Sequence, residues 1–391
     1  MRILHTSDWH LGRSFHREGL LGHQADYVDH LLEVVASERV DVVVVSGDVY
    51  DRALPPVEAV RLADETFARL AASRARAVVT SGNHDSAQRL GFGSRLIDAA
   101  GVFIRTDASA VGTPVVLDDD HGPVAIHGIP FLDPTLLQEP WQLPVRSHQT
   151  ALAEAMRRIR ADLATRRAGT RSIVLAHAFV GGGAVDVEPS DSERDLSVGG
   201  VSLVPVSAFD GIDYAALGHL HGRHTLTRSV RYSGSPLAYS FSEAAHRKGS
   251  WLVELDAEGL ASAEFVDAPV PRPLARIAGP IDTLLTDPRL ARHEQSWVQA
   301  TVTDEQRPMR AMERLRRRFP HTLVLGFEPA GGHPAPTPAA RRRGRSDHEI
   351  ALDFVGDLRG TPASIAESAL LQAACDSCCG DPDVDALVSE G

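Results

Sequence analysis

The chain has 391 residues, of which 43% are hydrophobic and 24% charged, as expected for a soluble globular protein of two or three domains. It has no run of eighteen apolar residues and no long apolar N-terminal stretch, so we expect neither a membrane span nor a secretory signal, and a cytoplasmic location. The net charge of −12 argues against nucleic acid as a partner, although residues 272–345 carry fourteen Arg against seven Asp and Glu.

Strand and helix patterns alternate through the first 270 residues. Strands are predicted over 1–7, 40–45, 75–80, 124–129, 172–176 and 214–217, and helices over 23–38, 57–72 and 150–167. The run 40–45 is continuously β-branched, which is typical of a strand buried on both faces. Residues 250–255 and 263–266 resemble a closing hairpin. This order predicts an α/β fold with right-handed crossovers.

The pattern changes after about residue 270. Strands over 297–302 and 322–327 flank a basic helix over 308–319, which predicts a small α+β domain. Residues 331–345 are rich in Gly, Pro, Ala and Arg and read as a linker. Two short amphipathic helices, 349–355 and 362–374, are too small to bury a core alone, so we expect them to dock on something. The predicted domains are thus 1–270, 271–330 and 346–391.

Five stretches end a hydrophobic run with residues that bind metals. They are Asp8-Trp9-His10, Gly47-Asp48, Gly82-Asn83-His84-Asp85, Ala176-His177 and Gly218-His219-Leu220-His221. Each follows a predicted strand, where open α/β sheets place their sites. A pair of divalent cations takes carboxylate, imidazole and amide oxygen ligands, with one carboxylate as a bridge. The set therefore predicts a two-metal phosphoesterase site.

Each signal also has an ordinary structural interpretation. A single Asp-x-His or His-x-His is usually a turn, and Asn and His after a strand can cap a helix, but five such stretches in this order favour a metal site. The basic helix contains Arg310, Arg314 and Arg317. From the sequence alone, a solvated helix face and a DNA contact are equally good interpretations of it. Cys375, Cys378 and Cys379 form no disulfide framework or zinc knuckle, and we interpret them as ordinary thiols in a mobile tail.

With these motifs placed, the chain resembles the calcineurin-like metallophosphoesterase superfamily and, within it, the nuclease subunits of bacterial SbcC–SbcD complexes. The resemblance rests on residues 1–12, on Gly47-Asp48-Val49-Tyr50-Asp51, on Leu217-Gly218-His219 and on Tyr232-Ser233-Gly234-Ser235-Pro236. It implies a two-sheet sandwich flanked by helices, followed by a smaller capping domain that binds DNA and a C-terminal helical tail. The resemblance is strong over residues 1–270 and rests on pattern and size over 271–330.

The resemblance also implies roles for individual residues. One metal would be held by Asp8, His10, Asp48 and His221, and the other by Asp48, Asn83, His177 and His219; family members prefer manganese, Mn2+. His84 would stabilise the developing charge and protonate the leaving oxygen. Asp85 and Asp51 are the candidates to orient His84. Archaeal relatives have a second histidine where this chain has Asp51, so a role in aiming DNA is not carried over.

The resemblance implies a DNA nuclease of repair and recombination, acting as a double-strand exonuclease and a single-strand and hairpin endonuclease. The expected partner is an SbcC-type coiled-coil ATPase that meets the C-terminal helices. A homodimer formed through N-terminal helices, 23–38 among them, would complete a nucleoid-associated heterotetramer. In this setting the basic helix is interpreted as a DNA contact.

Three alternatives stay open. The first two are a small-molecule or cyclic-nucleotide phosphodiesterase and a phosphoprotein phosphatase; Gly-Asp-Val-Tyr-Asp-Arg resembles the phosphatase motif, although phosphatases usually have Glu where Asp85 stands. The third is a degenerate scaffold, but such proteins usually lose ligands and none is missing here.

Overall fold

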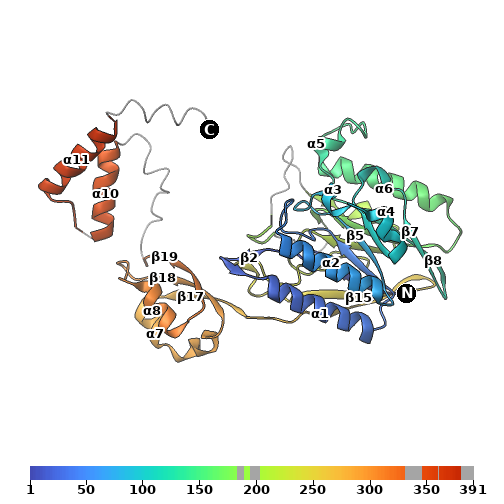
Figure 1. Cartoon of the computed structure of the whole chain (residues 1–391), viewed down its shortest axis with the longest axis horizontal. Helices are drawn as coiled ribbons and strands as arrows, with labels where there is room; N and C mark the ends of the chain where they lie inside the picture. Colours follow the sequence, from blue (N-terminus) through green and yellow to red (C-terminus); the bar gives the residue numbers. More distant parts are fainter. Residues whose placement is uncertain (183–188, 194–202, 331–345, 360, 380–391) are drawn as a thin grey trace. The chain divides into compact units, whose positions relative to one another are not determined.

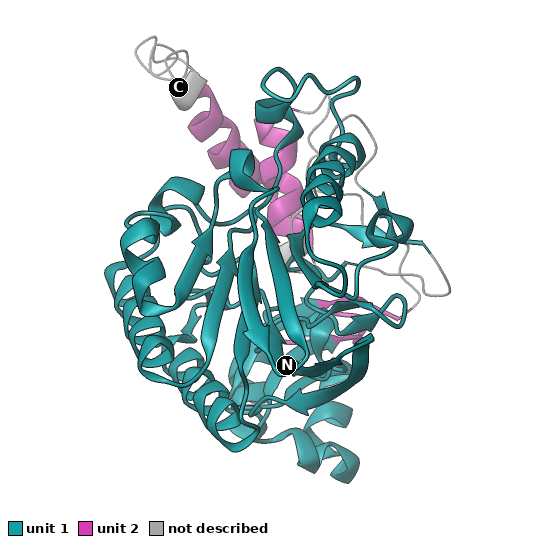
Figure 2. Ribbon diagram, turned by 90° about the vertical axis from the view of Figure 1, so that its right-hand side faces the viewer, with its two compact units in different colours: residues 1–301, 310–326 teal, residues 302–309, 327–391 magenta. Residues whose placement is uncertain are grey.

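A computed structural model describes residues 1–182, 189–193, 203–330, 346–359 and 361–379 (Figure 1). The chain divides into two compact units, residues 1–301 with 310–326, and residues 302–309 with 327–391 (Figure 2). The linker predicted over 331–345 lies outside the described residues, and the predicted domain boundaries stay predictions. Among the described helices, none is both long and apolar enough to cross a membrane.

Two six-stranded sheets form the first unit. The strands of one, in spatial order, are β16 (Gly259–Asp267), β15 (Gly249–Asp256), β1 (Arg2–Thr6), β4 (Val42–Ser46), β5 (Arg76–Thr80) and β6 (Val102–Arg105). Those of the other are β13 (His224–Thr225), β14 (Val230–Tyr232), β12 (Tyr214–Gly218), β9 (Arg171–His177), β8 (Gly122–Ile129) and β7 (Val115–Asp119). In the first sheet the consecutive strands β1, β4, β5 and β6 run parallel, and in the second sheet β14, β12, β9 and β8 do, so their carboxyl ends share one edge of each sheet.

Alternate residues of the central strands face opposite layers, which positions the core. In β4, Val42 and Val44 pack between the two sheets, whereas Val43 and Val45 pack beneath helices. α1 (Leu21–Ser37) and α2 (Val57–Ala72) cover the first sheet, and α6 (His148–Thr165) covers the second (Figure 1). The central strands of each sheet are therefore buried on both faces, and the predicted α/β sandwich of two sheets flanked by helices is confirmed.

Shorter elements connect these layers. The strands among them are β2 (Ser14–Phe15), β3 (Glu18–Gly19), β10 (Val180–Gly181) and β11 (Val204–Pro205). The helices are α3 (Ala87–Leu90), α4 (Ser94–Ile97) and α5 (Pro134–Leu137), with 3-10 turns at Asp98–Ala100, Ala108–Ala110, Val206–Phe209, Phe241–Glu243 and Pro288–His293.

A small α+β region follows the sandwich. Its sheet comprises β17 (Leu274–Gly279), β18 (Trp297–Val302) and β19 (Thr322–Phe327), with helices α7 (Ile281–Thr286) and α8 (Ala311–Arg318). The predicted strands 297–302 and 322–327 match β18 and β19, but α8 begins later than predicted because Arg310 adopts a left-handed φ of 52°. Trp297 packs with Phe15 and Phe241 of the sandwich, so an apolar cluster joins the two parts.

In the second unit, α10 (Asp347–Arg359) and α11 (Ile365–Cys379) pack together, and His348 Nε2 lies 3.0 Å from the Ser368 carbonyl. Helix α11 begins after Ser364 because Ser364 and Glu367 form a reciprocal capping box through their backbone N–H groups. Both helices are longer than predicted. Cys375, Cys378 and Cys379 belong to α11, so their predicted place in a mobile tail is corrected.

Candidate metal centre

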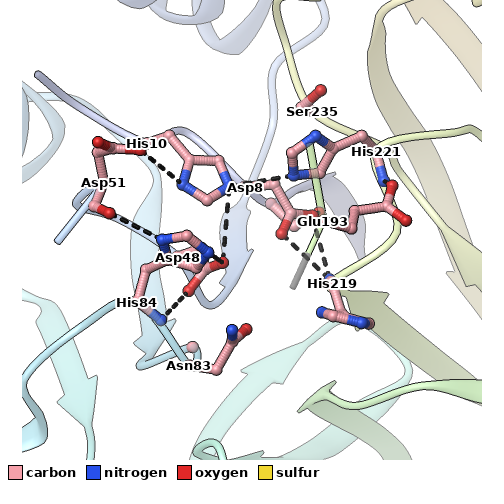
Figure 3. Close-up of polar contacts among 12 residues, drawn as sticks. Asp8, His10, Asp48, Asp51, Asn83, His84, Glu193, His219, His221 and Ser235 are labelled. Carbon is pink, nitrogen blue, oxygen red and sulfur yellow. Dashed lines mark hydrogen bonds and ion pairs between the residues drawn. The ribbon is translucent and has the colours of Figure 1, made fainter. Parts of the chain in front are cut away.

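The seven residues predicted to bind metals lie together at the carboxyl ends of the parallel strands, and Figure 3 labels all of them except His177. The first sheet contributes Asp8 and His10 after β1, Asp48 after β4 and Asn83 after β5. The second sheet contributes His177 at the end of β9, with His219 and His221 after β12. All except Asn83 are buried. The stacking of the two sheets thus brings together ligands that lie far apart in the sequence.

Four of these residues have an unusual backbone. Asp8, His10 and Asp48 have φ of 54°, 46° and 49°, and His219 has φ of 109°, in the region that residues other than glycine rarely adopt. This conformation turns the chain sharply after each strand. Two backbone hydrogen bonds, Asp8 N to the Gly47 carbonyl and His10 N to the Asp48 carbonyl, hold two of the loops together. Strain of this kind is concentrated at functional sites.

Glycines allow the loops to close on the ligands. A Cβ atom at Gly82 would collide with the Asp48 carboxylate, and one at Gly47 would collide with the His177 ring. Gly47 also has φ of 86°, which side chains disfavour. The close approach of these loops therefore depends on the absence of two side chains.

The spacing of the donor atoms suits two ions that share Asp48. Asp48 Oδ2 lies 3.5 Å from His10 Nε2 on one side and 3.5 Å from His177 Nε2 on the other. His10 Nε2 is 3.1 Å from His221 Nε2, and His177 Nε2 is 2.8 Å from Asn83 Oδ1. Two imidazole nitrogens so close together match two ligands of one cation, whose metal–nitrogen bonds are about 2.1 Å long.

Burial sets the charge state of the ligands. It lowers the pKa of His10 and His219 well below the ordinary value and that of His221 to about 4. These rings are therefore neutral at pH 7 and can present a lone pair. Burial also raises the pKa of Asp8 to about 7. A divalent cation would favour the ionised form of this carboxylate, so the residues fit a metal centre.

His84 lies beside this cluster without being needed in it. Its ring contacts that of His10 edge to face, with centroids 4.7 Å apart, and its Nε2 lies 4.0 Å from Asp48 Oδ2. Its Nδ1 is 2.7 Å from the backbone carbonyl of Asp51. A carbonyl only accepts hydrogen bonds, so Nδ1 carries a proton and Nε2 is the nitrogen that faces the cluster (Figure 3).

The two carboxylates predicted to orient His84 have other contacts. Asp85 accepts hydrogen bonds from the backbone N–H groups of Gly82, Val49 and Tyr50 at 2.9, 3.1 and 2.8 Å. The Asp51 carboxylate lies 3.4 Å from Arg13 Nη1 and 3.8 Å from His10 Nδ1. The hydrogen-bond acceptor at His84 Nδ1 is thus the backbone carbonyl of Asp51 and neither of the two carboxylates. Asp85 instead joins the loops around the site through their backbone N–H groups.

Three acidic or basic groups near His221 were missed by sequence reasoning. Glu193 Oε1 accepts a hydrogen bond from the backbone N–H of His221, and burial raises the pKa of Glu193 to about 7. Glu243 Oε1 lies 3.4 Å from His221 Nδ1, and Lys248 Nζ lies 2.5 Å from Glu243 Oε2. None of the three belongs to a metal-binding motif. The one available signal was that Lys248 is the only lysine in the sequence.

His84 also lines a cleft of about 570 Å³. Its other lining residues are Arg13, Ser14, Asp51, Arg52, Asp191, Ser192 and Glu193. The lining contains two arginines, which can bind an anionic group, and three acidic side chains, those of Asp51, Asp191 and Glu193.

The predicted DNA-binding arginines lie about helix α8. Arg314 forms an ion pair with Asp282 at 2.5 Å and Arg317 with Glu313 at 2.8 Å, while Arg310 lies 3.9 Å from Glu313. Arg310 and Arg317 remain 77% and 75% exposed. An open depression of about 550 Å³ is lined by Leu285, Glu294, Arg314, Arg317 and Arg318.

Comparison with known proteins adds two family matches. Residues 1–223, more than half of the chain, match the model of a family described as calcineurin-like phosphoesterase. Residues 270–354 match SbcD_C, described as the type 5 capsule protein repressor C-terminal domain.

Solved structures give distant likenesses. The protein TT1561 of Thermus thermophilus has 13% identity, with 68% of this chain and 98% of that chain covered and a TM-score of 0.41. A novel archaeal phosphodiesterase has 13% identity, with 68% of this chain and 100% of that chain covered and a TM-score of 0.31. A dimetal phosphatase from Danio rerio has 14% identity, with 69% of this chain and 99% of that chain covered and a TM-score of 0.39.

Proposed function

The chain belongs to the calcineurin-like phosphoesterase family, and from this premise we propose that it is a metal-dependent DNA nuclease, the nuclease subunit of an SbcC–SbcD-type complex. One observation supports DNA over a small substrate, namely that the metal centre is followed by a region matching SbcD_C and carrying exposed arginines. Repair and recombination of DNA in the nucleoid would be its setting.

We propose that the site holds two divalent cations, Mn2+, which when bound would polarise the phosphodiester and activate water. One would be held by Asp8, His10, Asp48 and His221. The other would be held by Asp48, Asn83, His177 and His219. His84 has its Nδ1 fixed by the Asp51 carbonyl and turns its Nε2 to the reacting centre. In its protonated form this ring would donate a proton to the leaving oxygen and stabilise negative charge. Arg13 and Arg52 in the cleft would bind flanking phosphates.

The α+β region would bind the DNA backbone. Arg314 and Arg317 line one open depression, and Arg310 precedes the same helix. Arg310 and Arg317, the two most exposed of the three, can exchange a surface ion pair for a phosphate at little cost. We assign them a sequence-independent contact.

Helices α10 and α11 would bind the coiled coil of an SbcC-type ATPase. Phe354 of α10 is 65% exposed, and Ile365 and Leu370 of α11 are 92% and 71% exposed. Large apolar side chains in water on a two-helix unit suit an apolar partner helix.

A second apolar surface supports a homodimer within this complex. Leu54 and Val57, before and at the start of α2, and Phe92 and Leu96, around α4, are largely exposed. The Arg89 side chain donates to the Ala53 carbonyl at 3.0 Å, which links the two segments. This surface supports the proposal better than helix 23–38, whose large apolar residues are mostly buried.

The test is manganese-dependent cleavage of a labelled DNA hairpin and a linear duplex by wild-type protein and by His84→Gln. We expect the wild type to cut both and the variant to lose about 10²–10⁴-fold in rate while still binding metal, because it loses the proton donor alone. His121→Gln, at an exposed histidine, is the matched control and should cut like the wild type.

Cleavage of a generic phosphodiester without any cleavage of DNA would instead favour the small-molecule phosphodiesterase. Absence of both activities in metal-loaded protein would favour the scaffold.

A further inference from the structure

Lys248 is the only lysine among the 40 Lys and Arg residues of the chain. All the others are arginines, including those on the surface. An arginine has a wide planar head with five donors, whereas a lysine ends in a compact ammonium with three. A lone lysine in such a chain therefore points to a place that requires the smaller group.

The environment of Lys248 fits this requirement. The side chain is only 6% exposed, and its ammonium has three acceptors at hydrogen-bond distance. They are the His221 carbonyl at 2.8 Å, Ser235 Oγ at 2.9 Å and Glu243 Oε2 at 2.5 Å. All three N–H groups are thus used in a pocket that closes around them.

Glu243 connects this ammonium to His221. Its side chain is fully buried, and Oε1, the oxygen that does not face Lys248, lies 3.4 Å from His221 Nδ1. Ser192 Oγ lies 2.7 Å from the same Nδ1 and donates to Glu243 Oε1 at 2.5 Å. The carboxylate therefore reaches Nδ1 both directly and through a hydroxyl. A carboxylate at this depth needs a cation beside it, and Lys248 supplies one.

The opposite nitrogen of the same ring belongs to the metal centre. His221 Nε2 lies 3.1 Å from His10 Nε2. A proton held on Nδ1 leaves the lone pair on Nε2, and a carboxylate on the far side of a ligating imidazole fixes the ring and strengthens it as a ligand.

We propose that Lys248 and Glu243 are positioning residues for one of the two metals, acting through His221. Glu243 holds the His221 ring in the tautomer that ligates through Nε2, and Lys248 binds both Glu243 and the His221 backbone in one arrangement. The inference rests on the proposed metal-dependent function, and it concerns the ion shared by His10 and His221, leaving the ion at His177 unaffected.

The experiment compares metal binding to stripped protein by titration calorimetry with Mn2+. The variants are Lys248→Met, Glu243→Gln and Lys248→Arg, and Arg247→Met is the matched control. We expect one of two binding events to weaken about 10–100-fold in the first two variants, while the other keeps its wild-type dissociation constant. Lys248→Arg should weaken the same event, because the guanidinium does not fit the pocket. The control removes the Arg247–Asp267 pair, whose side chains are each 58% exposed, and the contact of the guanidinium with the Phe265 ring, and it should bind like the wild type.

The thermal midpoint of each metal-free variant separates positioning from a general structural role. Equal weakening of both events together with a lower metal-free midpoint would overturn the proposal, as would wild-type binding in Glu243→Gln or in Lys248→Met. Wild-type binding by Lys248→Arg would overturn the requirement for a compact ammonium. If Lys248→Met fails to fold, Glu243→Gln decides, since it keeps the size and shape of the side chain while removing its charge and one of its two acceptor oxygens.

The two proposals fail in different ways. A wild-type protein that binds two ions but does not cut DNA contradicts the nuclease function and leaves the positioning test valid. A wild-type protein that cuts DNA, with variants that bind both ions normally, contradicts the positioning inference alone.

Discussion

Asp51 shows how one residue can serve a site through its backbone and its side chain separately. Its carbonyl accepts the hydrogen bond of His84 Nδ1 at 2.7 Å, while its carboxylate lies near Arg13 and His10. The carbonyl would remain after any substitution that preserves the backbone. The orientation of His84 should therefore tolerate changes that a side-chain orienting group would not.

The first prediction follows for Asp51→Ala. We expect its kcat on a generic phosphodiester with Mn2+ to fall less than about tenfold, because the Asp51 carbonyl still fixes His84, against the far larger loss expected for His84→Gln. Asp51→Asn, which keeps the size of the side chain, is the control for packing. A loss in Asp51→Ala as large as in His84→Gln would place the carboxylate in the reaction itself.

At the scale of elements, Arg171 of β9 and Asp119 of β7 join strands on either side of β8. Arg171 is 3% exposed, and its two terminal nitrogens lie 3.0 and 2.5 Å from the Asp119 oxygens. Burial alone would raise the pKa of Asp119, but hydrogen bonds from Arg171, from the N-terminal ammonium of Met1 at 2.8 Å and from the His121 backbone outweigh it and hold the pKa well below its usual range. The pair therefore stabilises the folded state only while Asp119 is ionised.

The second prediction is that Asp119→Asn lowers the free energy of unfolding by roughly 2–4 kcal/mol at pH 7, because Arg171 and the N-terminal ammonium of Met1 both stay buried without their counter-ion. Since the pKa of Asp119 is depressed in the folded state, its contribution is present above the unfolded value of about 3.9 and is lost as the pH falls below it. Urea unfolding at pH 7 and pH 3 should show the difference between wild type and variant shrinking at the lower pH. A difference independent of pH would contradict the assignment.

Helix α8 gives the third prediction. Reversing Arg314 and Arg317 to Glu should weaken DNA binding and reduce the slope of log affinity against log salt by about 2, one unit for each lost phosphate contact. Arg157 and Arg167, exposed in and after α6, provide a control double reversal with the same change in net charge. Equal effects from both pairs would mean that net charge alone matters, and no effect from either would leave α8 as a solvated face.

Elements with a strong local pattern could be predicted from the sequence. The helix over 57–72 coincides with α2, because its apolar spacing and the preceding prolines define it locally. Helix α8 was extended too far toward its N-terminus, since nothing in the sequence marks Arg310 as left-handed. The candidate metal-binding residues, which the fold brings together, could be picked out because each follows a strand, and their role as ligands stays a prediction. Glu243 and Lys248 could not be picked out, because their meaning lies in a contact with His221 that only the folded chain creates.

At the scale of the whole molecule, the proposed partner site and the metal centre lie in separate compact units. The fourth prediction is that deleting residues 346–391 abolishes binding of an SbcC-type ATPase in a pull-down, because it removes both exposed helices, while manganese-dependent phosphodiesterase activity stays within about twofold. The point variant Phe354→Asp in the full chain is a smaller change at an exposed side chain and should weaken the same binding. Retained partner binding after the deletion would contradict the docking assignment.

The division of the candidate metal ligands between two sheets has a consequence for the lifetime of the fold. Asp8, His10, Asp48 and Asn83 come from one layer and His177, His219 and His221 from the other, so a bound pair of cations would tie the layers together. By mass action, each ion that binds only the folded chain adds about 2.7 kcal/mol at a hundredfold excess over its dissociation constant. The metal supply of the cell would then govern how long each molecule survives between encounters with proteases, as well as how fast it works.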